Sequence, residues 1–211
     1  MNWREKRLFY KKMKKSNKAI LLIHEIYGVN DHMNFMKEKL SKLEADIICP
    51  NLLSNDVPYS YKEEGMAYQN FVQNIGMDEG SRQITNMLIQ LKQEYEEVGV
   101  IGFSVGATMS WLCSESKLCN FVIGCYGSRI RDYVNRSPVC PTLLIFPAEE
   151  QTFDVDCLIN SLVQKREPLL EIKKFYGGHG FMNPFSQAFN KESADQAFQT
   201  ISEFLKKHLA D

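Results

Sequence analysis

Short continuous hydrophobic runs alternate along the chain with segments in which hydrophobic residues recur every three or four positions. A short apolar run is typical of a strand that is buried on both faces. Recurrence every three or four residues is typical of a helix with one buried face. The runs predict strands at 19–23, 45–50, 98–103, 121–127, 141–146 and 169–175.

The intervals between these runs show helical spacing. Asn30 or Asp31 can cap a first helix, because either side chain accepts a hydrogen bond from a free backbone N–H group. Further helices are predicted from Ser104 onward and near 155–165, whereas the polar stretch from 51 to about 80 predicts an irregular loop and one short helix. The residues that mark buried helix faces are Phe35, Met36, Leu40 and Leu43, then Ile84, Leu88, Leu91 and Tyr95, and finally Ala194, Ala197, Phe198, Ile201, Phe204, Leu205 and Leu209.

This alternation of strands and helices predicts an α/β fold with a mostly parallel sheet and helices on both faces, a three-layer sandwich. No repeat or linker divides the chain, so a single domain over residues 1–211 is expected. The basic residues 1–17 are expected to form an N-terminal extension or an edge strand. Because ligands bind at the carboxyl ends of parallel strands, we expect the loops after Ile23, Phe103, Phe146 and Phe175 to converge.

Composition and charge narrow the possible functions. The chain has 211 residues, of which 44% are hydrophobic and 24% charged, and its net charge is −1. These values indicate a soluble globular protein and give no reason to expect a nucleic-acid partner. No apolar run is long enough to span a membrane, and the basic first stretch lacks the apolar core of a secretory signal. A cytoplasmic location is therefore expected.

The cysteines and histidines do not predict a metal site. The six cysteines form no Cys-x-x-Cys pair, and the four histidines show no ligand spacing. Without an export signal, the cysteines are expected to be reduced and mostly buried. We expect the protein to need no metal ion and no cofactor, and to be a monomer or a weak homodimer.

The sequence Gly-Phe-Ser-Val-Gly at 102–106 stands where a predicted strand meets a predicted helix. In a nucleophile elbow the serine backbone is strained, so the residues two positions away must be small. Gly102 and Gly106 satisfy this requirement. The helix start behind Ser104 supplies free N–H groups, and that of Val105 is the natural donor to an oxyanion. A serine that only caps the helix is the alternative interpretation.

His179 lies between glycines in Tyr-Gly-Gly-His-Gly-Phe, after the last predicted strand. A serine hydroxyl needs a base to become a nucleophile, and imidazole titrates in a suitable range. A carboxylate must orient that imidazole, and Glu149, Glu150 and Asp154 all follow the strand at 141–146. The order serine, acid, histidine is that of α/β-hydrolases.

Three motifs in this order, IHEIYGVNDHM, GFSVGA and GGHGFMNP, resemble the dienelactone hydrolase family of α/β-hydrolases. The resemblance extends over about residues 18–208. It implies an α/β-hydrolase fold with a catalytic triad of Ser104, Glu150 and His179. It also implies an oxyanion hole formed by the N–H groups of Ile26 and Val105. A further family residue, which lies beside the nucleophile, corresponds to Glu25.

The chain departs from the family pattern at the nucleophile and at the acid. The type member has a cysteine nucleophile where this chain has Ser104. A serine hydroxyl is too weak an acid to lose its proton to a glutamate, so His179 is expected to be the base and Glu25 to shape the site. The acid loop reads Pro-Ala-Glu-Glu at 147–150 in place of Gly-x-x-Asp, which leaves Asp154 as an alternative acid.

A third departure concerns substrate charge. The type member binds its anionic substrate with arginines, and Asn183 occupies the position shortly after the histidine that would hold one. Arg82 and Arg129 are candidates to replace it. The resemblance therefore does not extend to the anionic dienelactone substrate.

The predicted function is hydrolysis of a small-molecule ester, lactone or thioester through an acyl-enzyme, with no nucleic-acid or membrane partner. The aromatic-rich segment Tyr59–Phe71 is a candidate lid or pocket wall, and packing of an irregular loop is the alternative. A catalytically weak or inactive hydrolase-fold protein that binds a small ligand or a protein partner is a second possible function, suggested by the unusual acid loop. A thiol enzyme that uses Cys125 or Cys49 is a third.

Overall fold

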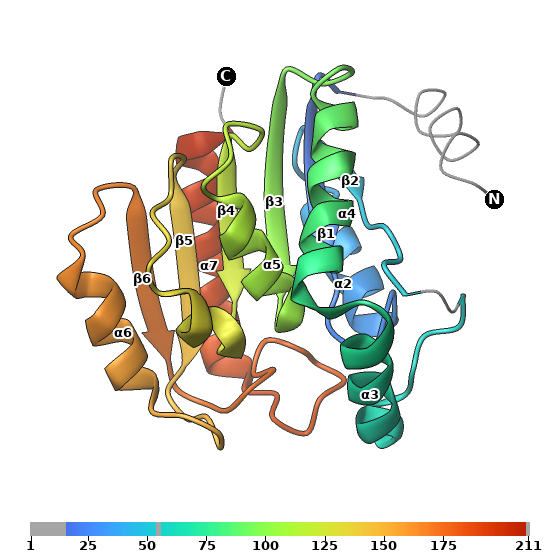
Figure 1. Ribbon diagram of the computed structural model, residues 1–211, viewed down its shortest axis with the longest axis vertical. Coiled ribbons are helices and arrows are strands. Elements are labelled where there is room, and N and C mark those ends of the chain that lie inside the picture. The colour runs from blue at the N-terminus through green and yellow to red at the C-terminus, as the bar shows by residue number, and fades with distance from the viewer. Residues whose placement is uncertain (1–15, 54–55, 210–211) are drawn as a thin grey trace.

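The computed structural model of the chain describes residues 16–53 and 56–209 (Figure 1). The predicted basic extension or edge strand at 1–17 lies outside these residues, except for Ser16 and Asn17. The Asn17 carbonyl accepts a hydrogen bond from the Glu96 N–H group at 2.8 Å, which joins the starts of two neighbouring strands.

In the described part of the chain, six parallel strands form one sheet in the order β2-β1-β3-β4-β5-β6. All six predicted strands are present, with bounds within two residues of those expected. β1 is buried along its whole length, as its continuous apolar run indicates. The strands are β1 (Lys18–Ile23), β2 (Asp46–Ile48), β3 (Glu97–Phe103), β4 (Phe121–Cys125), β5 (Thr142–Pro147) and β6 (Leu170–Phe175).

Helices cover both faces of this sheet, which confirms the three-layer α/β architecture (Figure 1). The α-helices are α2 (Asp31–Leu40), α3 (Glu64–Asn74), α4 (Gly76–Leu91), α5 (Val105–Cys113), α6 (Val155–Gln164) and α7 (Lys191–His208). Two short 3-10 helices are η1 (Tyr61–Glu63) and η2 (Ser128–Tyr133). Within residues 16–53 and 56–209, no helix has both the length and the apolar character that a membrane crossing requires.

Hydrophobic cores lie on both faces of the sheet because successive side chains of a strand point to opposite faces. On one face, Met33 of α2 and Ile201 of α7 share a core with Leu22 of β1. On the other face, Leu88 of α4 shares a core with Leu21 of β1. The sheet is thereby fixed from both sides, and its strand ends provide a rigid edge for the loops.

The prediction of an irregular loop and one short helix between 51 and 80 was wrong in part. Residues 64–74 form α3, and α4 begins at Gly76, earlier than the apolar spacing indicated. Ala67 and Phe71 are the only buried residues of α3, so its apolar side is too narrow to stand out in the sequence. Gly76 is the first residue of α4, and its φ of 65° changes the direction of the chain between the two helices.

Capping side chains fix where two of the helices begin. Of the two candidate caps of α2, Asn30 is the one that acts, because its side chain accepts the N–H of Met33 at 3.3 Å. Asp154 caps α6 in the same way and accepts the N–H of Cys157 at 3.0 Å. Asp154 is therefore held at a helix start, a position that bears on the choice of acid below.

The loops that follow the parallel strands meet at one edge of the sheet, as expected. The Ser104 N–H after β3 donates to the carbonyl of Cys125 at the end of β4, at 3.0 Å. The Ala148 N–H after β5 donates to the carbonyl of Phe175 at the end of β6, at 2.7 Å. In Figure 1 the loop between β6 and α7 passes below the strand ends toward α3.

Candidate active site

Ser104 occupies a strained turn between β3 and α5. Its φ of 56° and ψ of −117° lie in a region that residues other than glycine rarely adopt. A Cβ atom at Gly102 would lie 2.2 Å from the Gly106 carbonyl oxygen, and one at Gly106 would lie 2.6 Å from the carbonyl oxygen of His24. Both glycines are thus required by close backbone contacts, as the elbow motif predicts.

Replacing Gly106 by alanine is expected to destabilise the protein by about 1–3 kcal/mol, because the new methyl group meets rigid backbone atoms. Thermal or denaturant unfolding measures this loss. Gly65→Ala is the matched control, since a Cβ atom at Gly65 has no neighbour within 4 Å and alanine favours the helix. Equal stability of the two variants would contradict the tight elbow.

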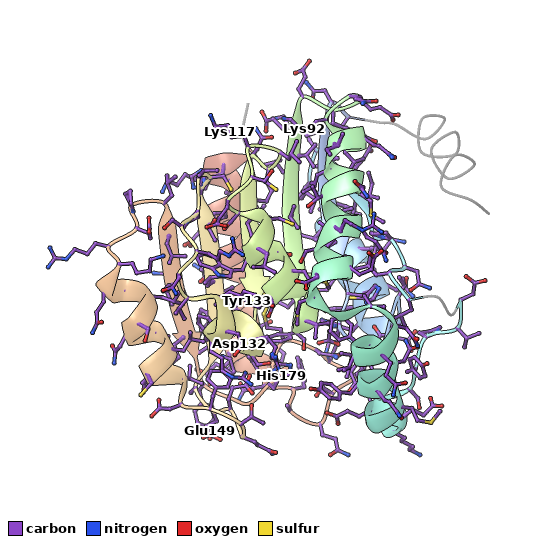
Figure 2. All side chains as sticks on the ribbon, in the orientation of Figure 1. Lys92, Lys117, Asp132, Tyr133, Glu149 and His179 are labelled. Atoms are coloured by element: carbon purple, nitrogen blue, oxygen red, sulfur yellow. The ribbon has the colours of Figure 1, made fainter. Side chains whose placement is uncertain are left out.

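A continuous hydrogen-bonded chain links Ser104, His179 and Glu150. The His179 Nε2 lies 2.9 Å from the Ser104 Oγ, and its Nδ1 lies 2.7 Å from the Glu150 Oε1. Figure 2 shows His179 beneath the carboxyl ends of the central strands. These distances fit a serine, a base and a carboxylate that orients the base.

Among the three candidate acids, only Glu150 reaches the imidazole. Glu149 is exposed, and Asp154 is engaged as the cap of α6. The Glu149 N–H donates to the Gly177 carbonyl at 3.1 Å, which holds the acid loop against the histidine loop. The side chain of Glu150 is 7% exposed, so the extra methylene relative to aspartate is accommodated inside the protein.

The charges around His179 favour its protonated form. Burial lowers the pKa of the imidazole, but hydrogen bonding and attraction from Glu150 raise it more. The carboxylates of Glu25 and Glu64 add to this attraction, and the pKa of His179 is raised above its ordinary value of 6.5. The ring also packs edge-on against Tyr126, with centroids 5.2 Å apart.

The backbone N–H groups of Ile26 and Val105 flank the elbow without acceptors of their own. Neither donates a hydrogen bond to any residue in the described part of the chain. Val105 is the first residue of α5, where free N–H groups and the helix dipole favour negative charge. Their part in an oxyanion hole stays a prediction.

Glu25 lies in a buried polar cluster that the sequence did not reveal. Its Oε2 lies 3.5 Å from the Nδ1 of His32, which is completely buried at the start of α2. Burial raises the pKa of the Glu25 carboxyl, but the nearby His32 and His179 rings lower it more, and the net direction is downward. Glu25 is therefore a buried carboxylate whose charge acts on His179, and its site-shaping role stays a prediction. The position of His32 in the sequence did not indicate its contact with Glu25.

His24 has a structural role next to this cluster. Its Nε2 accepts the N–H of Leu52 at 2.9 Å, so its Nδ1 carries the hydrogen and donates to the Glu25 carbonyl. Desolvation by burial lowers the pKa of His24, which keeps the ring neutral. The ring thereby ties the β1 loop to the segment after β2.

The segment 59–71 contacts the loops that contain Tyr27 and Asn183. The Tyr59 N–H donates to the Tyr27 carbonyl at 2.9 Å. The Tyr61 hydroxyl accepts hydrogen bonds from the side-chain amides of Asn183 at 2.7 Å and Asn30 at 3.0 Å. This favours the pocket-wall interpretation of the segment. The polar environment of Asn30 and Asn183 could not be deduced from their positions in the sequence.

The positions considered for an arginine that binds an anionic substrate do not provide a free cation. Asn183 is 1% exposed and holds Tyr61. Arg82 forms two hydrogen bonds with Glu79, each 2.7 Å long, and Arg129 pairs with Asp132 at 2.6 Å. None of these three side chains is therefore an unpaired cation that could bind a carboxylate of the substrate.

The cysteines considered as nucleophiles are poorly suited to that role. Cys125 is completely buried, and burial raises the pKa of its thiol. Burial likewise raises the pKa of Cys49 to about 12. A thiol with such a pKa has almost no thiolate near neutral pH. Across the described residues, no group of histidine, cysteine and acidic side chains could hold a metal ion.

An open hollow of about 600 Å³ lies along the acid loop. Residues 148–156 line it, including Glu150, whereas Ser104 and His179 do not. We do not assign it to the reacting part of a substrate.

The fold and the site can be compared with known proteins. The model of the dienelactone hydrolase family matches residues 6–209. YczH, an uncharacterized protein of Bacillus subtilis (strain 168), is 43% identical over 172 residues, which cover 82% of this chain and 84% of that protein.

Two solved structures share the fold at low sequence identity. The dienelactone hydrolase-like promiscuous phosphotriesterase P91 from metagenomic libraries superposes with a TM-score of 0.76 at 13% identity, over 92% of this chain and 88% of that one. The Pyrococcus furiosus esterase Pf2001 gives a TM-score of 0.69 at 17% identity, over 92% and 84% of the two chains. Together with the family match over nearly the whole sequence, these likenesses show that the chain belongs to the dienelactone hydrolase family of α/β-hydrolases.

Proposed function

We propose that this ester-acting hydrolase is a serine enzyme that cleaves a small-molecule ester, lactone or thioester through an acyl-enzyme. One observation supports this proposal above all others: the chain of contacts from the Ser104 Oγ through His179 to the Glu150 carboxylate. Its serine lies on a strained turn at the start of a helix, where free N–H groups are available.

In the first half of the reaction, Ser104 attacks the carbonyl carbon of the substrate while His179 takes its proton at Nε2. The Ile26 and Val105 N–H groups stabilise the oxyanion of the tetrahedral intermediate. Glu150 keeps the hydrogen of the neutral ring on Nδ1 and stabilises the imidazolium. His179 then gives the proton to the leaving alcohol or thiol, and the acyl group stays on Ser104.

In the second half, His179 takes a proton from water, and the resulting hydroxide attacks the acyl carbon. The second tetrahedral intermediate uses the same two N–H donors and collapses to release the acid. The proton on His179 returns to the Ser104 oxygen. The serine, its base, the two backbone donors and water are sufficient for every step.

The proposed site-shaping role of Glu25 is electrostatic. The carboxylate is 4% exposed and cannot act as the base for a serine hydroxyl. It contributes to the raised pKa of His179 and thereby stabilises the imidazolium formed during attack. A monomeric or weakly dimeric state and a cytoplasmic location remain predictions.

The proposal is tested by p-nitrophenyl ester hydrolysis with rapid mixing. An acyl-enzyme predicts a burst of p-nitrophenol no larger than one equivalent per Ser104, followed by slower turnover wherever deacylation limits the rate. Mass spectrometry of the quenched protein should show the acyl group on the peptide that contains Ser104. No hydrolysis of esters, lactones or thioesters above background would favour the alternative of a binding protein without turnover.

The pH profile of kcat/KM should show an acidic limb with a pKa above the ordinary histidine value of 6.5. The base must be neutral to accept the Ser104 proton, so activity is expected to fall as the pH falls through the raised pKa of His179. A limb well below pH 6.5 would contradict the carboxylate environment described for His179.

Glu64→Gln provides the matched variant for this profile, because Glu64 is exposed and its charge acts on His179. Its removal should shift the acidic limb to lower pH. Glu203→Gln removes the same charge from an exposed position of α7 and should leave the limb unchanged.

A further inference from the structure

Tyr61 stands between the loops that contain the proposed oxyanion donor and the proposed base. Its ring packs edge-on against Tyr27, the residue after Ile26, with centroids 4.8 Å apart. Its hydroxyl contacts Asn183, which lies on the same loop as His179. Tyr61 is half-buried, and the charge of Glu25 acts both on Tyr61 and on His179.

The neighbouring backbone fixes which atom each asparagine presents to Tyr61. The Asn30 Oδ1 accepts the N–H of Met33 at 3.3 Å, and the Asn183 Oδ1 accepts the N–H of Phe185 at 2.9 Å. Each side-chain NH₂ group is therefore directed at the Tyr61 hydroxyl, at 3.0 Å and 2.7 Å. These two donors occupy both lone pairs of the phenolic oxygen.

The hydrogen of the Tyr61 hydroxyl consequently has no acceptor among the described residues. Both neighbours in the network are donors, and no other residue in the described part of the chain accepts this hydrogen. A hydroxyl that already accepts hydrogen bonds becomes a stronger donor. Burial raises the pKa of Tyr61 to about 12, so the phenol keeps its hydrogen at assay pH.

Negative charge surrounds this donor. Glu25 and Asp31 both act on Tyr61, and Glu25 and Glu64 both act on His179. The arginines considered above are paired with carboxylates of their own. An anionic acceptor would meet like charges at this place, whereas an uncharged oxygen would not.

We propose that Tyr61 is a specificity-determining residue that donates its free hydroxyl hydrogen to an uncharged oxygen of the substrate, such as an ether, carbonyl or hydroxyl oxygen near the scissile ester. The inference rests on the proposed function, because it places that oxygen next to the acyl or alcohol group bound at Ser104. It assigns the substrate to oxygen-bearing, uncharged esters or lactones and not to carboxylates.

Matched ester pairs test this role. The pair p-nitrophenyl methoxyacetate and butyrate differs only by an oxygen in place of a methylene. The pair 4-oxopentanoate and 4-methylpentanoate places a carbonyl farther along the acyl chain. Within each pair the ratio of kcat/KM values is compared between wild type and Tyr61→Phe, so that the intrinsic reactivity of each ester cancels.

Tyr61→Phe is expected to lower this ratio about 3- to 10-fold in at least one pair, which corresponds to one lost hydrogen bond between uncharged groups. Tyr133→Phe, a change outside this segment and this network at a side chain that packs against the core around Trp111, should leave both ratios unchanged. A general loss of activity that affects both members of each pair equally would show that Tyr61 only positions Asn30 and Asn183. That result, or unchanged ratios with full activity, would overturn the proposal.

The charge of the acceptor is tested with p-nitrophenyl hydrogen adipate and its neutral methyl ester. The anion should be hydrolysed about 10-fold more slowly, with a difference that narrows in about 0.5 M NaCl. Faster hydrolysis of the anion would overturn the assignment to uncharged acceptors. If the wild type hydrolyses no ester faster than Ser104→Ala does, the proposed function fails, and this outcome differs from unchanged ratios in an active enzyme.

Discussion

Replacing Ser104 by alanine is expected to lower kcat/KM for ester hydrolysis by about 10⁴-fold or more, because the acyl-enzyme can no longer form. The fold should be retained, since the close contacts of the elbow are made by Gly102 and Gly106 and not by the serine side chain. Steady-state hydrolysis of p-nitrophenyl butyrate and a thermal melt of the same sample measure both properties.

Cys125→Ala is the control for this experiment. Cys125 is buried at the end of β4, next to the elbow, and its thiol is the nearest alternative considered as nucleophile. The variant should keep activity within about threefold of wild type, since only a small buried group is lost. Activity that survives in Ser104→Ala and disappears in Cys125→Ala would reverse the assignment of the nucleophile.

Replacing Glu150 by glutamine is expected to lower kcat by about 10³- to 10⁴-fold. The amide cannot stabilise the imidazolium, and its NH₂ group can donate to Nδ1 of His179. The ring hydrogen would then move to Nε2, where it blocks acceptance of the serine proton. Pre-steady-state and steady-state hydrolysis should both show the loss, with little change in the melting temperature.

Glu149→Gln is the matched control for the acid. It changes the neighbouring carboxylate, which is exposed and does not contact His179, and activity should remain near that of wild type. Glu150→Asp should show an intermediate loss, because the shorter side chain withdraws the carboxylate from Nδ1. Equal losses in the Glu149 and Glu150 variants would contradict the assignment of a single acid.

The strands and the order of the motifs could be predicted because both depend on local sequence. Each strand is a continuous apolar run with clear ends, and the elbow requires small residues at fixed positions. A short helix was predicted between 51 and 80, but the bounds of α3 could not be, since Ala67 and Phe71 are its only buried residues in an otherwise polar stretch. Two buried apolar positions are too few to show where a helix begins and ends.

The residues alone left the acid open among Glu149, Glu150 and Asp154, and only the family resemblance indicated Glu150. Glu149 and Glu150 are neighbours, and only the path of the backbone between β5 and α6 decides which carboxylate points toward His179. Tyr61 lies outside the three motifs, and His32 lies in the same motif as Glu25 without a spacing that indicates their contact. Their contacts with Asn183 and Glu25 depend on how distant segments pack, which one sequence does not show.

The contacts that build the site join segments far apart in the chain. Ser104 and His179 are separated by 75 positions, and Tyr61 and Asn183 by 122. Contacts between such distant segments close large loops, and their entropy cost is recovered only after the intervening strands have paired. We therefore expect the ability to hydrolyse esters to be regained late in folding. In a refolding experiment, recovery of activity would follow recovery of helical signal and would report the last step by which the chain becomes native.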